Sequence, residues 1–406
     1  MINWQKVKLG EIVKLQQGFA LNKKSNHYLS QEKNGIPLLR ISDLLNDTQS
    51  LFVKTNIPKQ FIANENDIIY SRTGQVGHAF INKKGVVYNN CFKVIVDEKT
   101  DKNFLYFFLN TPDIRAVVKS LATGTAQPDL NHDAFKSVKI NLPPLLTQQK
   151  IAKILSNYDD LIENNLKRIK LLEEYATLTY EEWFLRFRIN GKKLDIDANN
   201  NLPFEWKKRS ITKCDSFQQD KSKVTEFKGK KTYYATADID GNAITDDGEI
   251  IDWNNKPSRA QIKPKNNTVW FARMSDTYKV LCFNNRNFDL QNNIVLSSGF
   301  AGFKAKNDLC LPFLYCTINS KFFHELKNLY ATGATQVSLN NDSMNFIKIT
   351  EPKLNLVERF GKITLPLIEE ISVLRSKNEL LKEARDILLP RLMTGMINTD
   401  EMDIAL

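Results

Sequence analysis

The chain repeats a large part of its own sequence after an interval of about 200 residues. Residues 122–131 read ATGTAQPDLN and residues 331–340 read ATGATQVSLN, so six of these ten positions are identical at an offset of 209. The same offset then continues without a gap as far as residue 383, and nearer the start of each copy the pair Gln16-Gln17 matches Gln218-Gln219 at an offset of 202. This interval exceeds the roughly 20–50 residues of a solenoid unit, so the repeat predicts a tandem duplication of a whole module.

Each module is predicted to begin with short strands and to close with a long helix. Runs of β-branched and aromatic residues bounded by Asn, Gly and Lys are typical of strands. The runs are DIIYSR (67–72), GVVYNN (85–90), FKVIVD (92–97), NTVWFAR (267–273) and NIVLSS (293–298). A helical segment is expected at 103–121, with its counterpart at 311–329. The polar, Asn-rich stretch 190–205 is interpreted as the linker between the modules.

The closing helices are predicted from apolar residues that recur at alternating spacings of four and three, a coiled-coil seam. An apolar stripe this long needs a long partner, and the other repeat supplies one. We therefore expect an antiparallel helix pair that holds two modules apart, although each helix could instead pack only on its own module. The residues expected at the seam are Ile151, Leu155, Tyr158, Ile162, Ile169, Leu172 and Trp183 in the first helix, and Leu367, Ile371, Leu374, Leu381 and Leu388 in the second.

Two residue types qualify this helix pattern. Asn165 and Asn378 occupy seam positions that do not coincide in the repeat, and a lone Asn at such a position can fix the register of a helix pair. Pro366 is expected to break or begin the second helix and Pro390 to end it, because proline lacks the N–H that a helix interior needs. About 23 residues, or roughly 34 Å of helix, would lie between them.

The charge of the chain is positive, and the excess lies outside the predicted helices. The 406 residues carry a formal net charge of +11. Residues 1–146 contribute +7 and residues 191–352 contribute +5, whereas the helical segments 147–190 and 353–406 are close to neutral. A polyanion such as nucleic acid is the simplest partner for such a distribution.

Several classes of protein are disfavoured by what the sequence lacks. No run reaches the ~18 apolar residues of a membrane helix, and the charged N-terminus does not resemble a signal peptide, so we expect a cytoplasmic protein without a membrane partner. The five cysteines form no C-x-x-C pair, and a disulfide framework or metal cluster is not expected. Phosphate-binding loops, dinucleotide fingerprints and zinc-protease motifs are absent. His132-Asp133 is interpreted as a surface turn, and Pro128-Asp129 as a chance resemblance to a nuclease motif.

Candidate binding residues recur once in each module. A strand runs into Arg72, followed by Thr73 and Gln75, and the corresponding strand runs into Arg273, followed by Ser275. An arginine can read guanine or clamp a phosphate, and a surface arginine without either role is the alternative. The repeated loops add small hydroxyl, amide and backbone groups that suit phosphate or base edges, although a structural turn would explain them too. These loop residues are Thr123, Gly124, Thr125 and Gln127 in the first copy, and Thr332, Gly333, Thr335 and Gln336 in the second.

In this order, duplicated along the chain, these motifs resemble the specificity subunit of type I restriction–modification systems. The resemblance rests on W-x-x-V-x-L-G-E-I (4–12), LPPLLTQQKIAKIL (142–155), KLLEEYATLTYEEWFLRF (170–187), LLPRLMTGMI (388–397) and the two ATG-x-x-Q loops. It implies an α+β fold with two similar α/β target recognition domains in a pseudo-twofold arrangement, separated by two long antiparallel helices. The implied parts are target recognition domain 1 (1–146), helical spacer 1 (147–190), a linker with target recognition domain 2 (191–352), and helical spacer 2 with a tail (353–406).

The resemblance also implies a function without catalysis in this chain. Each recognition domain would read one half of a bipartite, asymmetric sequence in double-stranded DNA. Two modification subunits, which carry S-adenosylmethionine and methylate adenine, would bind the specificity subunit, and restriction subunits that use ATP and Mg would complete the nuclease. The chain itself would hold no cofactor and no metal. A stand-alone nucleic-acid-modifying enzyme and a structural coiled-coil adaptor are the alternatives.

Overall fold

The computed structural model describes residues 4–30, 34–124, 126–334, 336–399 and 402. It divides into two compact units. Unit 1 comprises Met1–Ile162 together with Leu380–Leu406, and unit 2 comprises Glu163–Glu379. Within the described residues, no helix has both the length and the apolar content needed to cross a membrane.

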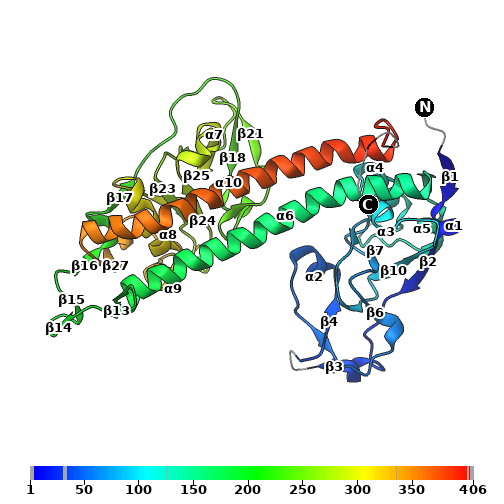
Figure 1. Ribbon diagram of the computed structural model, residues 1–406, viewed down its shortest axis with the longest axis horizontal. Helices are drawn as coiled ribbons and strands as arrows, with labels where there is room; N and C mark the ends of the chain where they lie inside the picture. Colours follow the sequence, from blue (N-terminus) through cyan, green and yellow to red (C-terminus); the bar gives the residue numbers. More distant parts are fainter. Residues whose placement is uncertain (1–3, 31–33, 125, 335, 400–401, 403–406) are drawn as a thin grey trace. The chain divides into compact units, whose positions relative to one another are not determined.

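Unit 1 is built around an antiparallel sheet with the order β2–β10–β7–β8 (Figure 1). A second sheet has the order β3–β5–β4–β9–β6, and β1 pairs with β11. The large core residues Tyr70 and Phe92 are fully buried in neighbouring strands of the first sheet, as alternating apolar residues in β-strands require. The strands are β1 (Gln5–Lys8), β2 (Val13–Gln17), β3 (Leu29–Ser30), β4 (Ile36–Leu39), β5 (Phe52–Val53), β6 (Ile62–Ala63), β7 (Ile68–Ser71), β8 (Ala79–Phe80), β9 (Gly85–Val87), β10 (Cys91–Val96) and β11 (Lys139–Leu142).

The helices of unit 1 correct one expectation. The single helix expected at 103–121 is two helices, because Thr111 has an extended backbone and precedes a proline, which disfavours the helical conformation. Asp101 caps the first of them by accepting a hydrogen bond from the Phe104 N–H at 2.8 Å. The helices are α1 (Leu9–Ile12), α2 (Ile41–Asn46), α3 (Lys102–Leu109), α4 (Pro112–Leu121) and α5 (His132–Ser137).

Unit 2 contains the corresponding sheet, with the order β17–β26–β23–β24. A second sheet has the order β21–β18–β25–β22, and β16 pairs with β27. The strands of these sheets are β16 (Lys207–Ser210), β17 (Phe217–Asp220), β18 (Lys231–Tyr234), β21 (Glu249–Ile251), β22 (Ala260–Ile262), β23 (Thr268–Ala272), β24 (Val280–Phe283), β25 (Ile294–Ser297), β26 (Phe300–Ala305) and β27 (Lys348–Glu351).

Two helices of unit 2, α8 and α9, correspond to α3 and α4 of unit 1. The helix expected at 311–329 is again two helices, which are separated at Ser320, and the Ser320 hydroxyl caps the second by accepting from the Phe323 N–H at 3.1 Å. The short helices are α7 (Phe288–Asn293), α8 (Leu311–Asn319) and α9 (Lys321–Leu329).

The expected linker at 190–205 is folded. It contributes to two small hairpins, and Asn190 and Gly191 take positive φ values in the first turn, as a tight hairpin requires. A third hairpin follows later in the unit. The paired strands are β12 (Arg188–Ile189) with β13 (Lys192–Lys193), β14 (Ile196–Asp197) with β15 (Leu202–Pro203), and β19 (Ile239–Asp240) with β20 (Ala243–Ile244).

The repeat in sequence is therefore a repeat in topology. The parallel pairing of β4 with β9 has its counterpart in the parallel pairing of β18 with β25. Two pairs of isolated β-bridges also correspond, since Asp129 bridges Thr73 and Thr123 while Ser338 bridges Met274 and Thr332. In unit 1 the loop after α4 is thus held against the end of β7. In unit 2 the loop after α9 is held in the same way against the end of β23, the strand equivalent to β7.

Two long helices close the modules. Helix α6 (Leu145–Tyr180) has 36 residues and continues into a π-helical turn, η3 (Glu181–Leu185), and α10 (Leu354–Met393) has 40 residues. The expectation that Pro366 and Pro390 delimit the second helix is wrong, because α10 runs through both. Both prolines are exposed, so the carbonyl that each deprives of a helical partner lies where water can hydrate it.

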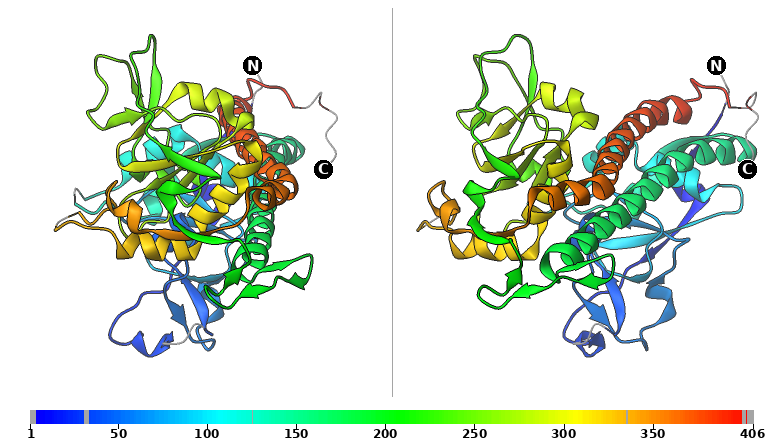
Figure 2. Two further views of the ribbon diagram at one scale, coloured as in Figure 1. Left: turned by 90° about the vertical axis from the view of Figure 1, so that its left-hand side faces the viewer. Right: turned by 60° about the vertical axis from the view of Figure 1, so that its left-hand side comes forward.

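The two long helices belong partly to each unit. Within unit 2, the second half of α6 lies antiparallel to the first part of α10 (Figure 1 and Figure 2). Asn165 donates to the Asn378 amide oxygen at 2.8 Å, and Arg375 forms an ion pair with Glu173 at 2.7 Å. Within unit 1, Arg385 forms an ion pair with Asp159 at 2.6 Å.

The residues expected at the helix seam are all buried or half-buried. In α6 and η3, Ile151, Leu155, Ile162, Ile169 and Trp183 are buried, and Tyr158 and Leu172 are half-buried. In α10, Ile371 and Leu374 are buried, and Leu367, Leu381 and Leu388 are half-buried. Most of these residues join the apolar core of their unit: Ile151, Leu155 and Leu388 in unit 1, and Ile169, Leu172, Trp183, Leu367, Ile371 and Leu374 in unit 2.

Candidate nucleic-acid interface

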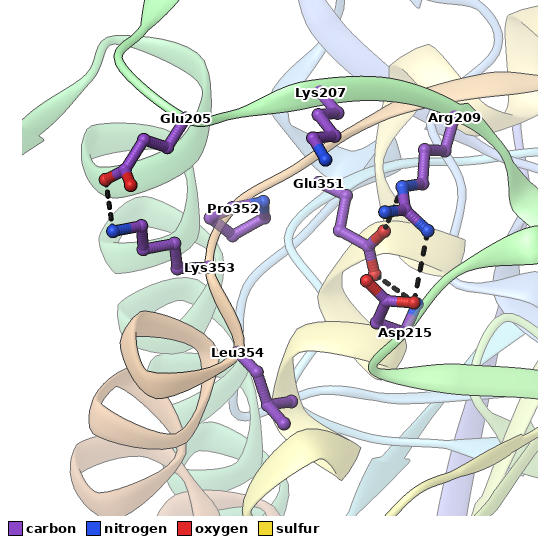
Figure 3. Close-up of a pocket in the computed structure, with 8 residues that line it drawn as sticks. All are labelled: Glu205, Lys207, Arg209, Asp215, Glu351, Pro352, Lys353 and Leu354. Carbon is purple, nitrogen blue, oxygen red and sulfur yellow. Dashed lines mark hydrogen bonds and ion pairs between the residues drawn. The ribbon is translucent and has the colours of Figure 1, made fainter.

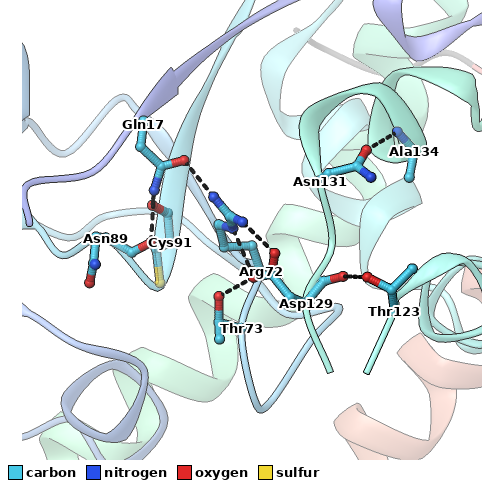
Figure 4. Close-up of polar contacts among 9 residues, drawn as sticks. All are labelled: Gln17, Arg72, Thr73, Asn89, Cys91, Thr123, Asp129, Asn131 and Ala134. Atoms are coloured by element: carbon cyan, nitrogen blue, oxygen red, sulfur yellow. Dashed lines mark hydrogen bonds and ion pairs between the residues drawn. The ribbon is translucent and has the colours of Figure 1, made fainter. Parts of the chain in front are cut away.

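The first candidate residue, Arg72, follows the end of β7 and is held by three hydrogen bonds (Figure 4). Its Nε and Nη2 atoms donate to the two carboxylate oxygens of Asp129, at 3.2 and 2.5 Å. Its Nη1 atom donates to the Gln17 side-chain oxygen at 3.0 Å, and the Gln17 amide in turn donates to the Asn89 carbonyl at 2.7 Å. The arginine side chain is 22% exposed, so it reaches the surface in a fixed orientation.

Asp129 is the hub of this site. In addition to Arg72, the Thr73 hydroxyl donates to its carboxylate at 2.5 Å. Burial alone would raise the pKa of Asp129, but the hydrogen bonds from Arg72 and Thr73 and the charge of Arg72 outweigh it, so the pKa is lowered. Asp129 is therefore an anion at neutral pH.

The loop of the first ATG-x-x-Q motif lies next to Asp129. Thr123 and Asp129 exchange two backbone hydrogen bonds, at 2.9 and 2.8 Å, which close the loop. Gly124 has φ +95°, and a Cβ there would lie 2.9 Å from the Gln127 carbonyl oxygen, so this closure requires glycine. Thr123, Gly124 and Gln127 are exposed, whereas Thr125 lies outside the described residues. Gln75 is exposed as well, within the turn after β7.

In unit 2, Arg273 follows the end of β23 in the same way. Its Nε donates to the Phe300 carbonyl at 3.0 Å, its Nη1 to the Leu339 carbonyl at 3.0 Å, and its Nη2 to the Asn341 side chain at 2.8 Å. The Gln219 amide donates to the same Asn341 oxygen at 3.2 Å. Burial lowers the pKa of Arg273, although the guanidinium remains charged.

The second ATG-x-x-Q loop has the same closure. Thr332 and Ser338 exchange two backbone hydrogen bonds of 3.0 Å, and Gly333 has φ +135°, where a Cβ would lie 2.3 Å from the Gln336 carbonyl oxygen. Thr332, Gly333 and Gln336 are exposed, and Thr335 lies outside the described residues. Ser275 is half-buried, and its N–H donates to the Val337 carbonyl at 2.9 Å, which ties it to the loop.

The structure thus brings the candidate residues of each unit together. In unit 1, Arg72 and Thr73 lie against Asp129 and the loop that contains Gly124, and in unit 2 Arg273 and Ser275 lie against the loop that contains Gly333. Exposed hydroxyl, amide and backbone groups around a fixed guanidinium can bind phosphate oxygens or the edges of bases.

Two polar pockets lie in unit 2. One, of about 380 Å³, adjoins the Arg273 site through Gln219. Its lining consists of Gln218, Gln219, Asp220, Lys221, Ser222, Lys265 and Lys304, so its polar and basic character suits an anion.

The second pocket, of about 430 Å³, lies where β16 and β27 meet the start of α10 (Figure 3). Most of its charges are paired: Glu351 faces Arg209 at 3.4 Å and accepts the N–H groups of Asp215 and Ser216, at 2.6 and 3.2 Å. Burial raises the pKa of Glu351 in spite of these hydrogen bonds. A set of paired charges explains this pocket as a structural ion-pair network.

No metal-binding arrangement was found in the described part of the chain, where no group of three or more His, Cys, Asp or Glu side chains is placed to hold an ion. His132 and Asp133 do not form the expected turn, because they lie in the first turn of α5, which Asn131 caps by accepting from the Ala134 N–H at 2.8 Å. The five cysteines are free, and four of them are buried.

Four members of these sites were not among the residues predicted from the sequence. Gln17 and Gln219 were visible as identical residues of the repeat, and that identity was the signal for their shared place beside the arginines. Asp129 was assigned to chance, yet it is the partner of Arg72. Asn341 carried no signal, since the first repeat has His132 at the corresponding position.

The first part of the chain matches a known family model, and most of the chain is similar to known proteins. Residues 1–174 match the family model described as type I restriction modification DNA specificity domain. The type I restriction enzyme MjaVIII specificity subunit of Methanocaldococcus jannaschii is 25% identical over 99% of this chain and 94% of its own length. The HindI specificity subunit of Haemophilus influenzae is 23% identical over 82% of this chain and 86% of its own length. The crystal structure of a type I restriction–modification S subunit from M. genitalium has a TM-score of 0.59 and 18% identity, over 96% of each chain.

The family model locates a type I DNA specificity domain within residues 1–174, and the two units of the chain have similar topology. The mixture of sheets and long helices is the fold of the M. genitalium S subunit. Residues 1–174 therefore match the DNA specificity domain of type I restriction–modification systems, and over most of its length the chain is similar to their specificity subunits.

Proposed function

We propose that this chain is the non-catalytic DNA-recognition subunit of its complex, and that each unit reads one half of a bipartite, asymmetric target. The observation that carries the proposal is the same constellation at the same strand end in both units: a fixed arginine, a repeated glutamine and an exposed glycine-closed loop. The residues around the two arginines differ, which supports two different half-sites. The positive charge of residues 1–146 and 191–352 supports a polyanionic ligand.

The proposal extends to partners and cofactors. Two modification subunits would bind the long helices 147–190 and 353–406, which would act as the spacer between recognition domains 1–146 and 191–352. Restriction subunits would complete the nuclease. S-adenosylmethionine would belong to the modification subunits, and ATP and Mg to the restriction subunits, so this chain would work in the cytoplasm without a cofactor of its own.

The test separates a recognition subunit from an enzyme. The purified chain, the purified modification subunit and their co-expressed complex are each incubated with host DNA from a strain lacking the system and with tritiated S-adenosylmethionine. We expect methyl transfer to DNA by the complex, and neither methyl transfer nor cleavage by this chain alone. Catalysis by the chain alone would support a stand-alone enzyme, and sequence-independent DNA binding by the complex would support a structural adaptor.

A further inference from the structure

The two strand-end arginines are held by partners of different charge. Arg72 forms a two-point ion pair with the carboxylate of Asp129, in addition to its bond to Gln17. Arg273 is held only by neutral acceptors, and within the described residues it forms no ion pair. The repeat replaces Asp129 with Ser338, and the two residues occupy the same backbone place, because each bridges the residue after its arginine.

The donors that remain on each arginine are equal in number. A guanidinium has five N–H groups. In both units one N–H from each of the three nitrogen atoms is donated within the protein, which leaves one N–H on each terminal nitrogen. The two sites therefore offer a ligand the same hydrogen bonds but a different charge.

This charge difference selects between the two kinds of oxygen on DNA. A phosphate that approaches Arg72 also meets the anion Asp129, and the repulsion offsets the attraction of the guanidinium. The edge of a base carries no net charge, so Asp129 repels a base far less than a phosphate. Asp129 also holds the Arg72 side chain in its orientation. A phosphate that approaches Arg273 meets no carboxylate partner and gains a charge-assisted hydrogen bond.

On the basis of the proposed function, we propose that Asp129 is a specificity-determining positioning residue. It makes Arg72 a reader of a base edge with two acceptors, such as that of guanine, whereas Arg273 contacts the phosphate backbone. The two equivalent arginines therefore have different roles: Arg72 contributes sequence discrimination in unit 1, and Arg273 contributes binding affinity in unit 2.

The test is the salt dependence of DNA binding by the complex of this chain with its modification subunit. The probes are a duplex bearing the sequence that the complex methylates and duplexes altered in either half. Asp129→Asn keeps the shape of the side chain and an acceptor for Arg72 but removes the charge. We expect the slope of log affinity against log salt to steepen by about 0.9, an extra loss of roughly 3.5-fold between 50 and 200 mM salt. Discrimination against an altered unit 1 half-site should fall.

The reciprocal change gives an independent result in the other unit. Ser338→Asp places a carboxylate at the position equivalent to Asp129, and we expect the slope to become shallower by about 0.9. A matched control is Glu98→Gln, which removes the same charge from an exposed residue beyond the far end of β10. The control should leave discrimination unchanged and alter the slope less than Asp129→Asn does.

The outcomes are distinct. Equal effects of Asp129→Asn and Glu98→Gln would show that only total charge matters and would overturn the inference. Unchanged slope and discrimination in both Asp129→Asn and Ser338→Asp would overturn it too. A wild-type complex that prefers no sequence would instead contradict the proposed function itself.

Discussion

The hydrogen bond between Asn165 and Asn378 is expected to set the register of α6 and α10 within unit 2. The two residues are not equivalent in the repeat, yet the antiparallel packing of the helices brings their amides to 2.8 Å. Asn378 is 3% exposed, among apolar neighbours such as Leu374. A change at either position therefore leaves an amide group without this partner inside the helix interface.

The size of the effect follows from that burial. Asn165→Leu deprives the buried Asn378 of a donor, and we expect a loss of about 1–3 kcal/mol in the free energy of unfolding. Asn378→Leu deprives the half-buried Asn165 of its acceptor, and water can replace part of it, so about 1 kcal/mol is expected. The double leucine variant removes both polar groups and should be close to wild type. The two changes should therefore be non-additive by roughly 2–4 kcal/mol, which is the sum of the two single losses.

Urea unfolding of the wild type, the two single variants and the double variant measures this coupling. Tryptophan fluorescence reports mainly on unit 2, because that unit holds Trp183, Trp206, Trp253 and Trp270, four of the five tryptophans. Additive losses, with the double variant the least stable of the four proteins, would refute the assignment of this pair to register.

Two further predictions concern unit 2. Burial, with a smaller effect of the nearby Lys327 charge, lowers the pKa of His324 to about 4 from 6.5, so the unfolded chain takes up this proton at a higher pH than the folded chain does. The free energy of unfolding should consequently fall as the pH drops from 6.5 towards 4, by about 2 kcal/mol at pH 5. Thermal unfolding at pH 7 and pH 5 should show a smaller loss of stability for His324→Phe than for the wild type. Gly361→Ala should destabilise unit 2 by about 3 kcal/mol in the same urea titration, because the added Cβ would lie 1.9 Å from the Leu309 carbonyl oxygen. The control Lys362→Ala, on the exposed face of α10, should have little effect. Similar losses of stability in the two variants would contradict the close packing of α10.

Features with a period or a repeat could be read from the sequence. The strands around Tyr70 and Trp270 were marked by β-branched and aromatic runs, and the helix seam by its spacing. The arginines at the ends of β7 and β23 followed from the same strands. In each case the signal is local, or is repeated 202 to 209 residues later, and needs no knowledge of tertiary contacts.

Features that depend on distant contacts could not be read. Arg72 and Asp129 are 57 residues apart in the sequence, and no local sequence pattern at either residue predicts their ion pair. The continuity of α10 through Pro366 depends on which face of the helix is exposed, which the sequence pattern did not resolve. The hairpin at Asn190-Gly191 did carry a signal, since Asn-Gly is typical of a two-residue turn, but the polar composition around it favoured a linker.

The most direct test of the account is the methylation that this chain directs. The chain is expressed with its modification subunit in a host that lacks the system, and methyladenine is mapped across the host genome. The account predicts methylation at one bipartite motif whose two specific halves differ in sequence and are separated by a gap of fixed length. Methylation at a continuous or palindromic motif, or no sequence-dependent methylation in cells that contain the assembled complex, would contradict it.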